Sequence, residues 1–288
     1  MALVTVKEIL TPKPAGWAVG AFNVHNLEDV QAVVWAAEKL EAPVIIQVSE
    51  SALKYAGAAY ISKIVQVAAG EAAVPIALQL DHGKSFELAL KCMKLGFTSV
   101  MIDGSHLPFF ENAALTKKVV AAARDYGVSV EGELGRVGGK EDDLDLAAGD
   151  AYLTEPNKAA QFVAETGIDL LAPAIGTLHG LYPGEPKIDF ARLREIRKLV
   201  EVPLVLHGGS DLPRAIIEEV ISSGVEKINV GTDLKYAVTN GIREFLERNP
   251  EEFEPRKVFG AARLKAEELV SKKIKLFKSV GMAKRVGI

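Results

Sequence analysis

Three of the five histidines in this chain follow short apolar runs, where their imidazole side chains could act together. They are His82 in the segment LDHG, His179 in TLHG and His207 in LHGG. Three imidazoles that leave one coordination position open are a common way to hold a catalytic zinc ion. The three lie far apart in the sequence, so only the fold could assemble a shared metal site. The alternative is a separate hydrogen-bonded role for each ring, because His25 and His106 also follow apolar runs.

Carboxyl, amide and hydroxyl side chains end the other apolar runs. They are Asn23, Ser49, Asp81, Asp103, Glu133 and Asn229. A polar side chain is costly in a core unless it is paired or lines a site, so this concentration predicts a functional site. The acidic segment 133–145 is long for a connection in a compact fold, and such segments are often lids. A carboxylate there, such as that of Glu141, could act as a mobile general base, or the segment could simply be a solvated surface.

Two glycine-containing segments, HGGS at 207–210 and NVGTD at 229–233, each lead into a helical pattern. Backbone N–H groups at the start of a helix bind phosphate well, whereas the alternative reading is that these glycines only form tight turns. Two such segments in consecutive units favour a phosphate site.

The elements that must position these residues recur about every 30 residues, which is the size of one βα unit. Eight β-branched runs are the expected strands: residues 19–24, 43–49, 75–82, 99–105, 129–135, 170–176, 203–210 and 227–233. Helical spacing lies between them, as in 26–41, 109–126 and 189–200. The pattern predicts an α/β fold, a (β/α)8 TIM barrel in a single domain over residues 1–288 with a C-terminal helical extension over about 250–288. An open doubly wound sheet is the alternative, but no Gly-x-Gly-x-x-Gly follows the first strand.

Composition excludes several other classes of protein. The chain has 288 residues with 34 Lys and Arg against 38 Asp and Glu, so a net charge of -4 argues against nucleic-acid binding. The single cysteine, Cys92, excludes an internal disulfide framework and a thiolate metal cluster. No apolar run is long enough to span a membrane. Lys7 and Glu8 interrupt the first apolar stretch, so we expect no secretion signal and a cytoplasmic protein.

Taken in order, these segments resemble the class II, metal-dependent ketose-bisphosphate aldolases. The resemblance rests on LDHG, SVMIDGSHLPFFEN, VEGELGRVGGKEDD, IGTLHGLYPGEPKIDF, LVLHGGSD and KINVGTDLK, and extends from AFNVHNLE to EPRK. It implies reversible, zinc-dependent cleavage of fructose 1,6-bisphosphate to dihydroxyacetone phosphate and glyceraldehyde 3-phosphate. Tagatose 1,6-bisphosphate or another phosphorylated ketose is the alternative substrate. A homodimer or homotetramer and activation by a monovalent cation are also implied.

The resemblance assigns a role to each candidate residue. His82, His179 and His207 match the zinc ligands, and Asp103 and Glu133 match an alternative or second metal position. Asp81 matches the acid/base on the C4 oxygen, Glu141 the carrier of the C3 proton, and Asn229 a further catalytic residue. The contacts to dihydroxyacetone phosphate are Gly180, Gly208, Gly209, Ser210, Asn229, Val230, Gly231 and Thr232. The residues for the other phosphate are Ser49, Lys235 and Arg256, the last of which acts either within its own subunit or across a subunit boundary.

Several residues bear on the alternatives. A Schiff-base aldolase needs a lysine inside the barrel, and we expect none there, with Lys227 at the bottom of the last strand. His25 is typical of tagatose-type members, whereas Gly83 favours the fructose type. Asp211 stands where glycine is common, and its charge would repel a phosphate unless it is turned away. A non-catalytic phosphosugar-binding protein and a metal-dependent barrel hydrolase are rival functions, but the complete set of candidate residues favours the aldolase.

Overall fold

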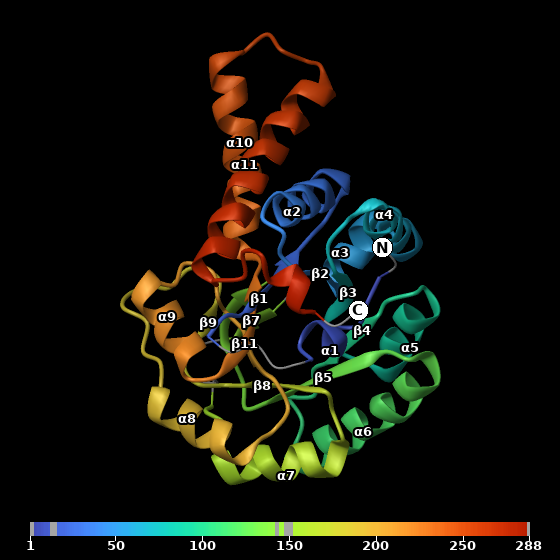
Figure 1. Cartoon of the computed structure of the whole chain (residues 1–288), viewed down its shortest axis with the longest axis vertical. Helices are drawn as coiled ribbons and strands as arrows, with labels where there is room; N and C mark the ends of the chain where they lie inside the picture. The colour runs from blue at the N-terminus through green and yellow to red at the C-terminus, as the bar shows by residue number, and fades with distance from the viewer. Residues whose placement is uncertain (1–2, 12–15, 142–143, 147–151, 287–288) are drawn as a thin grey trace.

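A computed structural model describes residues 3–11, 16–141, 144–146 and 152–286, and Figure 1 shows its arrangement. Eight parallel strands close into a barrel in the order β1-β11-β10-β8-β5-β4-β3-β2, with helices around the outside. The strands are β1 (Val19–Asn23), β2 (Val44–Ser49), β3 (Ile76–Gly83), β4 (Ser99–Ile102), β5 (Ser129–Leu134), β8 (Leu170–Pro173), β10 (Leu204–Leu206) and β11 (Val225–Val230). The predicted (β/α)8 barrel is therefore confirmed, and the sheet is not open.

The barrel strands are almost continuously apolar because both of their faces are buried. Inside the barrel, side chains such as Ile45 and Val205 form one apolar cluster with residues from the start of the chain. There, the short helix α1 (Val6–Ile9) lies across the amino ends of the strands, and the Val6 N–H donates to Ser99 Oγ at 3.1 Å. The amino end of the barrel is thus packed with apolar side chains.

The helices agree with the predicted ranges to within two residues where ranges were predicted. They are α2 (Leu27–Lys39), α3 (Glu50–Ala56), α4 (Ala58–Glu71), α5 (Phe86–Lys94), α6 (Phe109–Tyr126), α7 (Pro156–Thr166), α8 (Phe190–Leu199), α9 (Arg214–Ser222), α10 (Thr232–Arg248) and α11 (Pro255–Leu276). Gly127 and Gly167 end α6 and α7 in the left-handed conformation that glycine favours. In the described part of the chain, no helix is long and apolar enough to cross a membrane.

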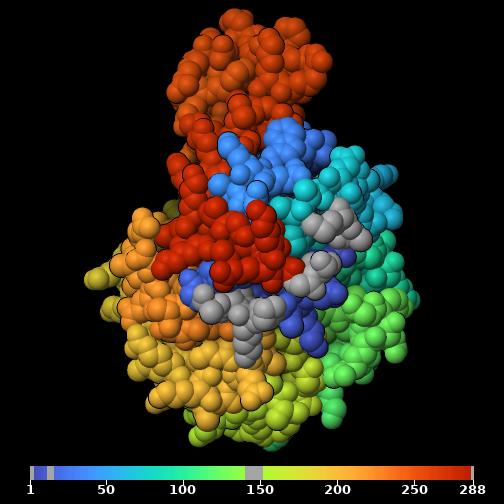
Figure 2. All heavy atoms as spheres, in the orientation of Figure 1, coloured from blue at the N-terminus to red at the C-terminus, as the bar shows by residue number. Residues whose placement is uncertain are grey.

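Helices α10 and α11 form an arm that projects from the barrel, as Figures 1 and 2 show. The two helices pack against each other, and α11 also packs against α2. The arm is larger than the predicted extension, because α10, the helix after the last barrel strand, runs out along it for about 25 Å.

The acidic segment that we expected to be a loop contains strands. A small sheet in the order β7-β6-β9 joins β6 (Gly138–Glu141) and β7 (Leu144–Leu146) to β9 (Leu178–His179). Its backbones approach very closely, because a Cβ at Gly139 would lie 2.2 Å from the His179 carbonyl oxygen and φ there is +99°. Glycine at this position therefore lets β6 lie directly against the strand that carries His179.

Candidate active site

The three predicted histidine ligands converge at the carboxyl end of the barrel. His82 is the last residue but one of β3, His179 lies on β9 and His207 follows β10. Their ring centroids are 4.8 to 5.8 Å apart, and their candidate ligand atoms all lie within 4.8 Å of one another. The backbone of His82 has a φ of +45° beside an irregularity in the pairing of β3 with β4. Such a bulge changes the direction of a side chain and here places the ring among the other two.

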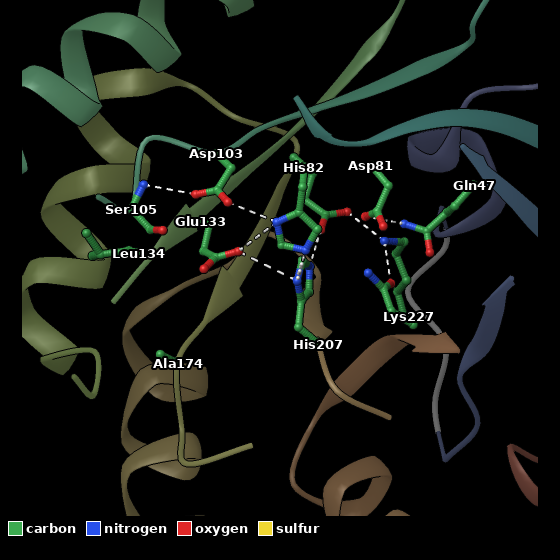
Figure 3. A network of polar contacts seen from close by, with 12 residues as sticks. Gln47, Asp81, His82, Asp103, Ser105, Glu133, Leu134, Ala174, His207 and Lys227 are labelled. Carbon is green, nitrogen blue, oxygen red and sulfur yellow. Dashed lines mark hydrogen bonds and ion pairs between the residues drawn. The ribbon is translucent and has the colours of Figure 1, made fainter. Parts of the chain in front are cut away.

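Two carboxylates orient the rings, as Figure 3 shows in part. His82 Nδ1 is 2.9 Å from Asp103 Oδ2, and His207 Nε2 is 2.9 Å from Glu131 Oε1. These nitrogens carry the protons if each ring is neutral, because a carboxylate only accepts hydrogen bonds. The lone pairs of His82 Nε2 and His207 Nδ1 then face each other at 3.1 Å, an arrangement that a bound cation stabilises.

Glu133 completes a site that fits a divalent cation. Its Oε2 is buried without a hydrogen-bond partner, 3.8 Å from His82 Nδ1 and 3.6 Å from His207 Nδ1. Burial and the negative charge of Asp103 raise the pKa of Glu133 well above its usual value. Imidazole nitrogens with carboxylate oxygens are a donor set that zinc accepts, either as the three histidines or as His82 with Asp103 and Glu133.

The pKa values of His82 and His207 are shifted in opposite directions. Burial lowers the pKa of His82, but the charge of Asp81 and the contact with Asp103 outweigh it and raise that pKa. Burial dominates at His207, whose pKa is lowered.

Asp81, beside His82 on β3, is held by amide side chains of β1 and β2. Asn23 Nδ2 donates to Asp81 Oδ2 at 2.7 Å, and Gln47 Nε2 donates to Asp81 Oδ1 at 3.1 Å. The carboxylate is 1% exposed, and Figure 3 shows it next to the His82 ring. It is therefore fixed in place beside the histidine cluster.

Lys227 lies inside the barrel, so the prediction that it stands at the bottom of the last strand is wrong. Strand β11 begins at Val225, and Lys227 Nζ is 2.8 Å from both Glu131 Oε2 and Asn229 Oδ1. Burial raises the pKa of Glu131, but Lys227 and His207 outweigh it and hold that pKa well below its usual range. An ion-paired ammonium has no lone pair for attack on a carbonyl carbon, so the position of Lys227 gives no support to a Schiff-base site.

The predicted phosphate segments lie side by side. The Gly209 N–H donates to the Asn229 carbonyl at 3.1 Å, and the Asp233 N–H donates to Ser210 Oγ at 3.2 Å. Glycine is required at Gly208, where φ is +69° and a Cβ would lie 2.2 Å from the Leu178 carbonyl oxygen. The candidate phosphate contacts that the fold gathers here are Gly180, Gly208, Gly209, Ser210, Asn229, Val230, Gly231 and Thr232.

The remaining candidates are placed differently. Ser49 pairs with Asp81 in the register of β2 and β3, and its hydroxyl caps α3. Lys235 is half-buried near the start of α10. Arg256, at the outer end of the arm, has a side chain that is 87% exposed and pairs with Glu254, so it does not join the site of its own chain. The backbone of Glu141 ends β6, but its side chain lies outside the described residues.

Four buried polar residues were missed because they lie within strands and not at their ends. They are Gln47, Gln79, Glu131 and Lys227. The only signal in the sequence was a polar residue inside an otherwise apolar run.

A cavity of about 290 Å³ opens beside the histidine cluster, a volume close to that of a small-molecule pocket. It is lined by His82, Lys84, Asp103, Ser105, His106, Glu133, Arg136, Val137, Gly139 and His179.

Comparison with known proteins gives one consistent result. A family model described as "Fructose-bisphosphate aldolase class-II" matches residues 4–282. A fructose-bisphosphate aldolase of Thermus caldophilus and a probable fructose-bisphosphate aldolase of Bacillus subtilis are each 47% identical, covering 98% of this chain and 100% of theirs. The crystal structure of the YdjI aldolase from Escherichia coli K12 is 33% identical, with a TM-score of 0.86 over 98% of this chain and 99% of that one. A putative fructose-1,6-biphosphate aldolase from Coccidioides immitis, also 33% identical, has a TM-score of 0.85 over 94% of each chain.

Proposed function

The chain belongs to the class II fructose-bisphosphate aldolase family, and from this we propose that it cleaves fructose 1,6-bisphosphate reversibly to dihydroxyacetone phosphate and glyceraldehyde 3-phosphate. It is thus a carbon–carbon lyase. The observation that carries the assignment is the convergence of three buried histidines beside Asp81, with adjacent glycine-rich loops suited to phosphate.

The metal-holding residues in this proposal are His82, His179 and His207, and Asp103 and Glu133 provide an alternative or second position. Zn²⁺ bound there supplies Lewis-acid stabilisation of the negative charge that develops on substrate oxygens. The outward hydrogen bonds from the rings to Asp103 and Glu131 keep the ligand nitrogens directed inward. A monovalent cation near the phosphate loops is a further part of the proposal.

Proton transfer is the role of two carboxylates. In the cleavage direction, Asp81 takes the proton from the C4 hydroxyl while the C3–C4 bond breaks, and it returns the proton in condensation. The amide groups of Asn23 and Gln47 hold Asp81 in the required orientation. The three-carbon product then needs a proton at C3, and we assign its delivery to Glu141 at the end of β6, the strand that pairs with β9.

The loops at 207–210 and 229–233 are assigned to binding of substrate phosphate. N–H groups around Gly208–Ser210 and the start of α10 suit the phosphate of the three-carbon fragment, because the partial positive charge of a helix N-terminus attracts an anion. Lys227 donates to Asn229 Oδ1, so the Asn229 NH2 group is left to donate to a substrate oxygen. Ser49 and Lys235 are assigned to the other phosphate.

The proposed oligomeric state is based on the arm formed by α10 and α11. Phe253, at the turn between α10 and α11, is 90% exposed, and Arg256 lies close to it in the sequence. We propose a homodimer or homotetramer in which the arm of one subunit brings Arg256 to the phosphate site of its neighbour. Light scattering after size exclusion measures the assembly, and a monomer at micromolar concentration would contradict it.

The direct test is a coupled assay of fructose and tagatose 1,6-bisphosphate cleavage, with EDTA and with zinc added back. We expect cleavage that EDTA abolishes and zinc restores, with a higher kcat/KM for fructose 1,6-bisphosphate. Asp81→Asn tests the proton-transfer role in the same assay. Asp169→Asn, which alters a carboxylate at the amino end of the barrel, is its matched control. Activity that persists in EDTA would exclude the metal role, and a higher kcat/KM for tagatose 1,6-bisphosphate would exclude the proposed substrate preference.

A further inference from the structure

Asp211, which has no role in the site as described, connects three loops at the carboxyl end of the barrel through its carboxylate and its backbone N–H. Asp211 lies in the turn between β10 and α9, beside the loop after β9 and the start of α10. We propose that Asp211 is a positioning residue that holds these three loops in the arrangement that binds substrate phosphate. This inference rests on the proposed function, because it deepens the role given to the phosphate loops.

One set of contacts joins Asp211 to the loop that follows His179. The Tyr182 N–H donates to Asp211 Oδ2 at 3.2 Å, and the Tyr182 hydroxyl donates to the Gly208 carbonyl at 2.9 Å. The same hydroxyl accepts from the Leu178 N–H at 3.0 Å. Burial, with the charge of Asp211, raises the pKa of Tyr182 to about 12, so the phenol keeps its proton near neutral pH. Tyr182 and Asp211 therefore tie the loop after β9 to Gly208.

A second set of contacts joins Asp211 to the arm. The Asp211 N–H donates to both oxygens of Asp233, at 3.2 and 3.3 Å, and the Asp233 N–H donates to Ser210 Oγ. Lys273 on α11 pairs with Asp233 at 2.5 Å, and its side chain is only 10% exposed. The turn at Asp211 is thus held on one side by the loop after β9 and on the other by α10 and α11.

The backbone of Asp211 makes both sets of contacts compatible. Its φ is +57°, in the left-handed region that few residues other than glycine, asparagine and aspartate adopt readily. In this conformation the N–H reaches Asp233 while the carboxylate reaches Tyr182. The repulsion expected between this carboxylate and a phosphate is therefore reduced, because its charge is directed to the Tyr182 N–H.

The replacement Asp211→Gly tests the role with little risk to folding, since glycine adopts the same φ freely and keeps the N–H that binds Asp233. Only the carboxylate contact with Tyr182 is lost. We expect the KM for fructose 1,6-bisphosphate to rise about tenfold while kcat stays within about threefold, because a hydrogen bond to a charged group is lost. Asp211→Asn keeps an acceptor and should raise KM by only about threefold. Lys278→Gly is the matched control, because Lys278 is also left-handed, with a φ of +60°, but lies just after α11, where its N–H donates to the Lys275 carbonyl.

Inorganic phosphate binding, measured by titration calorimetry, distinguishes this inference from the proposed function. If the wild-type protein cleaves neither bisphosphate, the proposed function fails, and weaker phosphate binding by Asp211→Gly would still support the positioning role. If the wild type cleaves fructose 1,6-bisphosphate but Asp211→Gly keeps its KM and its affinity for phosphate, the inference is wrong. Equal losses of kcat and thermal stability with an unchanged KM would also overturn it, because they would indicate a purely structural residue.

Discussion

Replacing Lys227 with methionine removes the ammonium group from the interior of the barrel while keeping a side chain of similar length. Lys227 is 0% exposed and its partner Glu131 is 1% exposed, so water cannot readily solvate the Glu131 carboxylate once the ammonium group is removed. The variant leaves the Glu131 carboxylate with Gln79 and His207 as its remaining partners. It also removes the hydrogen bond that orients Asn229.

The size of the effect follows from the burial of the pair. Removing one partner of a buried ion pair costs about 3–5 kcal/mol, because the other charge stays buried without compensation. For a chain of 288 residues, the unfolding entropy is about 0.6 kcal/mol per kelvin, so the Tm should fall by about 5–8 °C. Differential scanning calorimetry and urea unfolding followed by tryptophan fluorescence measure the change.

A second variant identifies the cause. In the Lys227→Met background, Glu131→Gln removes the uncompensated charge and should recover at least about half of the lost stability. Glu131→Gln alone removes the carboxylate that pairs with the Lys227 ammonium, leaves its hydrogen bond to Asn229 in place, and should be destabilising by itself. A coupling energy below about 0.5 kcal/mol in this double-mutant cycle would refute the ion-pair reasoning, as would a fall in Tm of less than about 1 °C for Lys227→Met.

Two further substitutions and one thiol measurement have expected outcomes. Gly208→Ala should lower the Tm measured by calorimetry by several degrees, because the new Cβ would lie 2.2 Å from the Leu178 carbonyl oxygen. The control Gly70→Ala places its Cβ in open space and should leave the Tm unchanged, so equal effects of the two substitutions would contradict this reasoning. Asp81→Asn should lower kcat by about 10²–10⁴-fold with bound zinc unchanged, and a loss below about tenfold would exclude its proton-transfer role. The Cys92 thiol is buried, and burial raises its pKa from 9.0 to about 12. The contribution of the neutral thiol to the free energy of unfolding is therefore intact below about pH 9 and declines as the pH rises toward 12. Ellman's reagent should label Cys92 only on unfolding, and rapid labelling of the native protein would contradict this.

The barrel could be predicted because its signal is local and repeated. Each strand is a short run such as 43–49 or 75–82 that is apolar on both faces, and each returns at the interval of a βα unit. The strand β11 was placed too late because Glu226, a charged residue, stands near its start. Its carboxylate is 4% exposed and accepts from the Leu204 N–H at 2.7 Å and from Arg197. Compensation from such distant residues is invisible in the local sequence.

The small sheet beside the site was missed for a related reason. Strand β6 is short and rich in glycine, which has a low preference for strands, and it pairs with β9, far along the chain. The pairing depends on close backbone approach at Gly139 and not on apolar side chains. The length of the arm was missed as well, because most of α10 is only partly buried and the helix packs against α11, the next helix along the chain.

The polar residues that were predicted and those that were missed form one buried cluster, and its charge explains why both sets occur. Among its described residues are four carboxylates, those of Asp81, Asp103, Glu131 and Glu133, and one ammonium group, that of Lys227. Lys227 compensates Glu131, while Asp103 lies against a histidine and Asp81 against amide groups. Glu133 is left with an oxygen that lacks a hydrogen bond, next to imidazole lone pairs. Burial and the charge of Asp103 raise the pKa of Glu133 and so disfavour its ionised form. A divalent cation would stabilise that ionised carboxylate, whereas an isolated buried charge costs several kcal/mol. In the proposed function, the residues at the strand ends would bind the cation, and those within the strands would fix the orientation and charge of the residues that bind it.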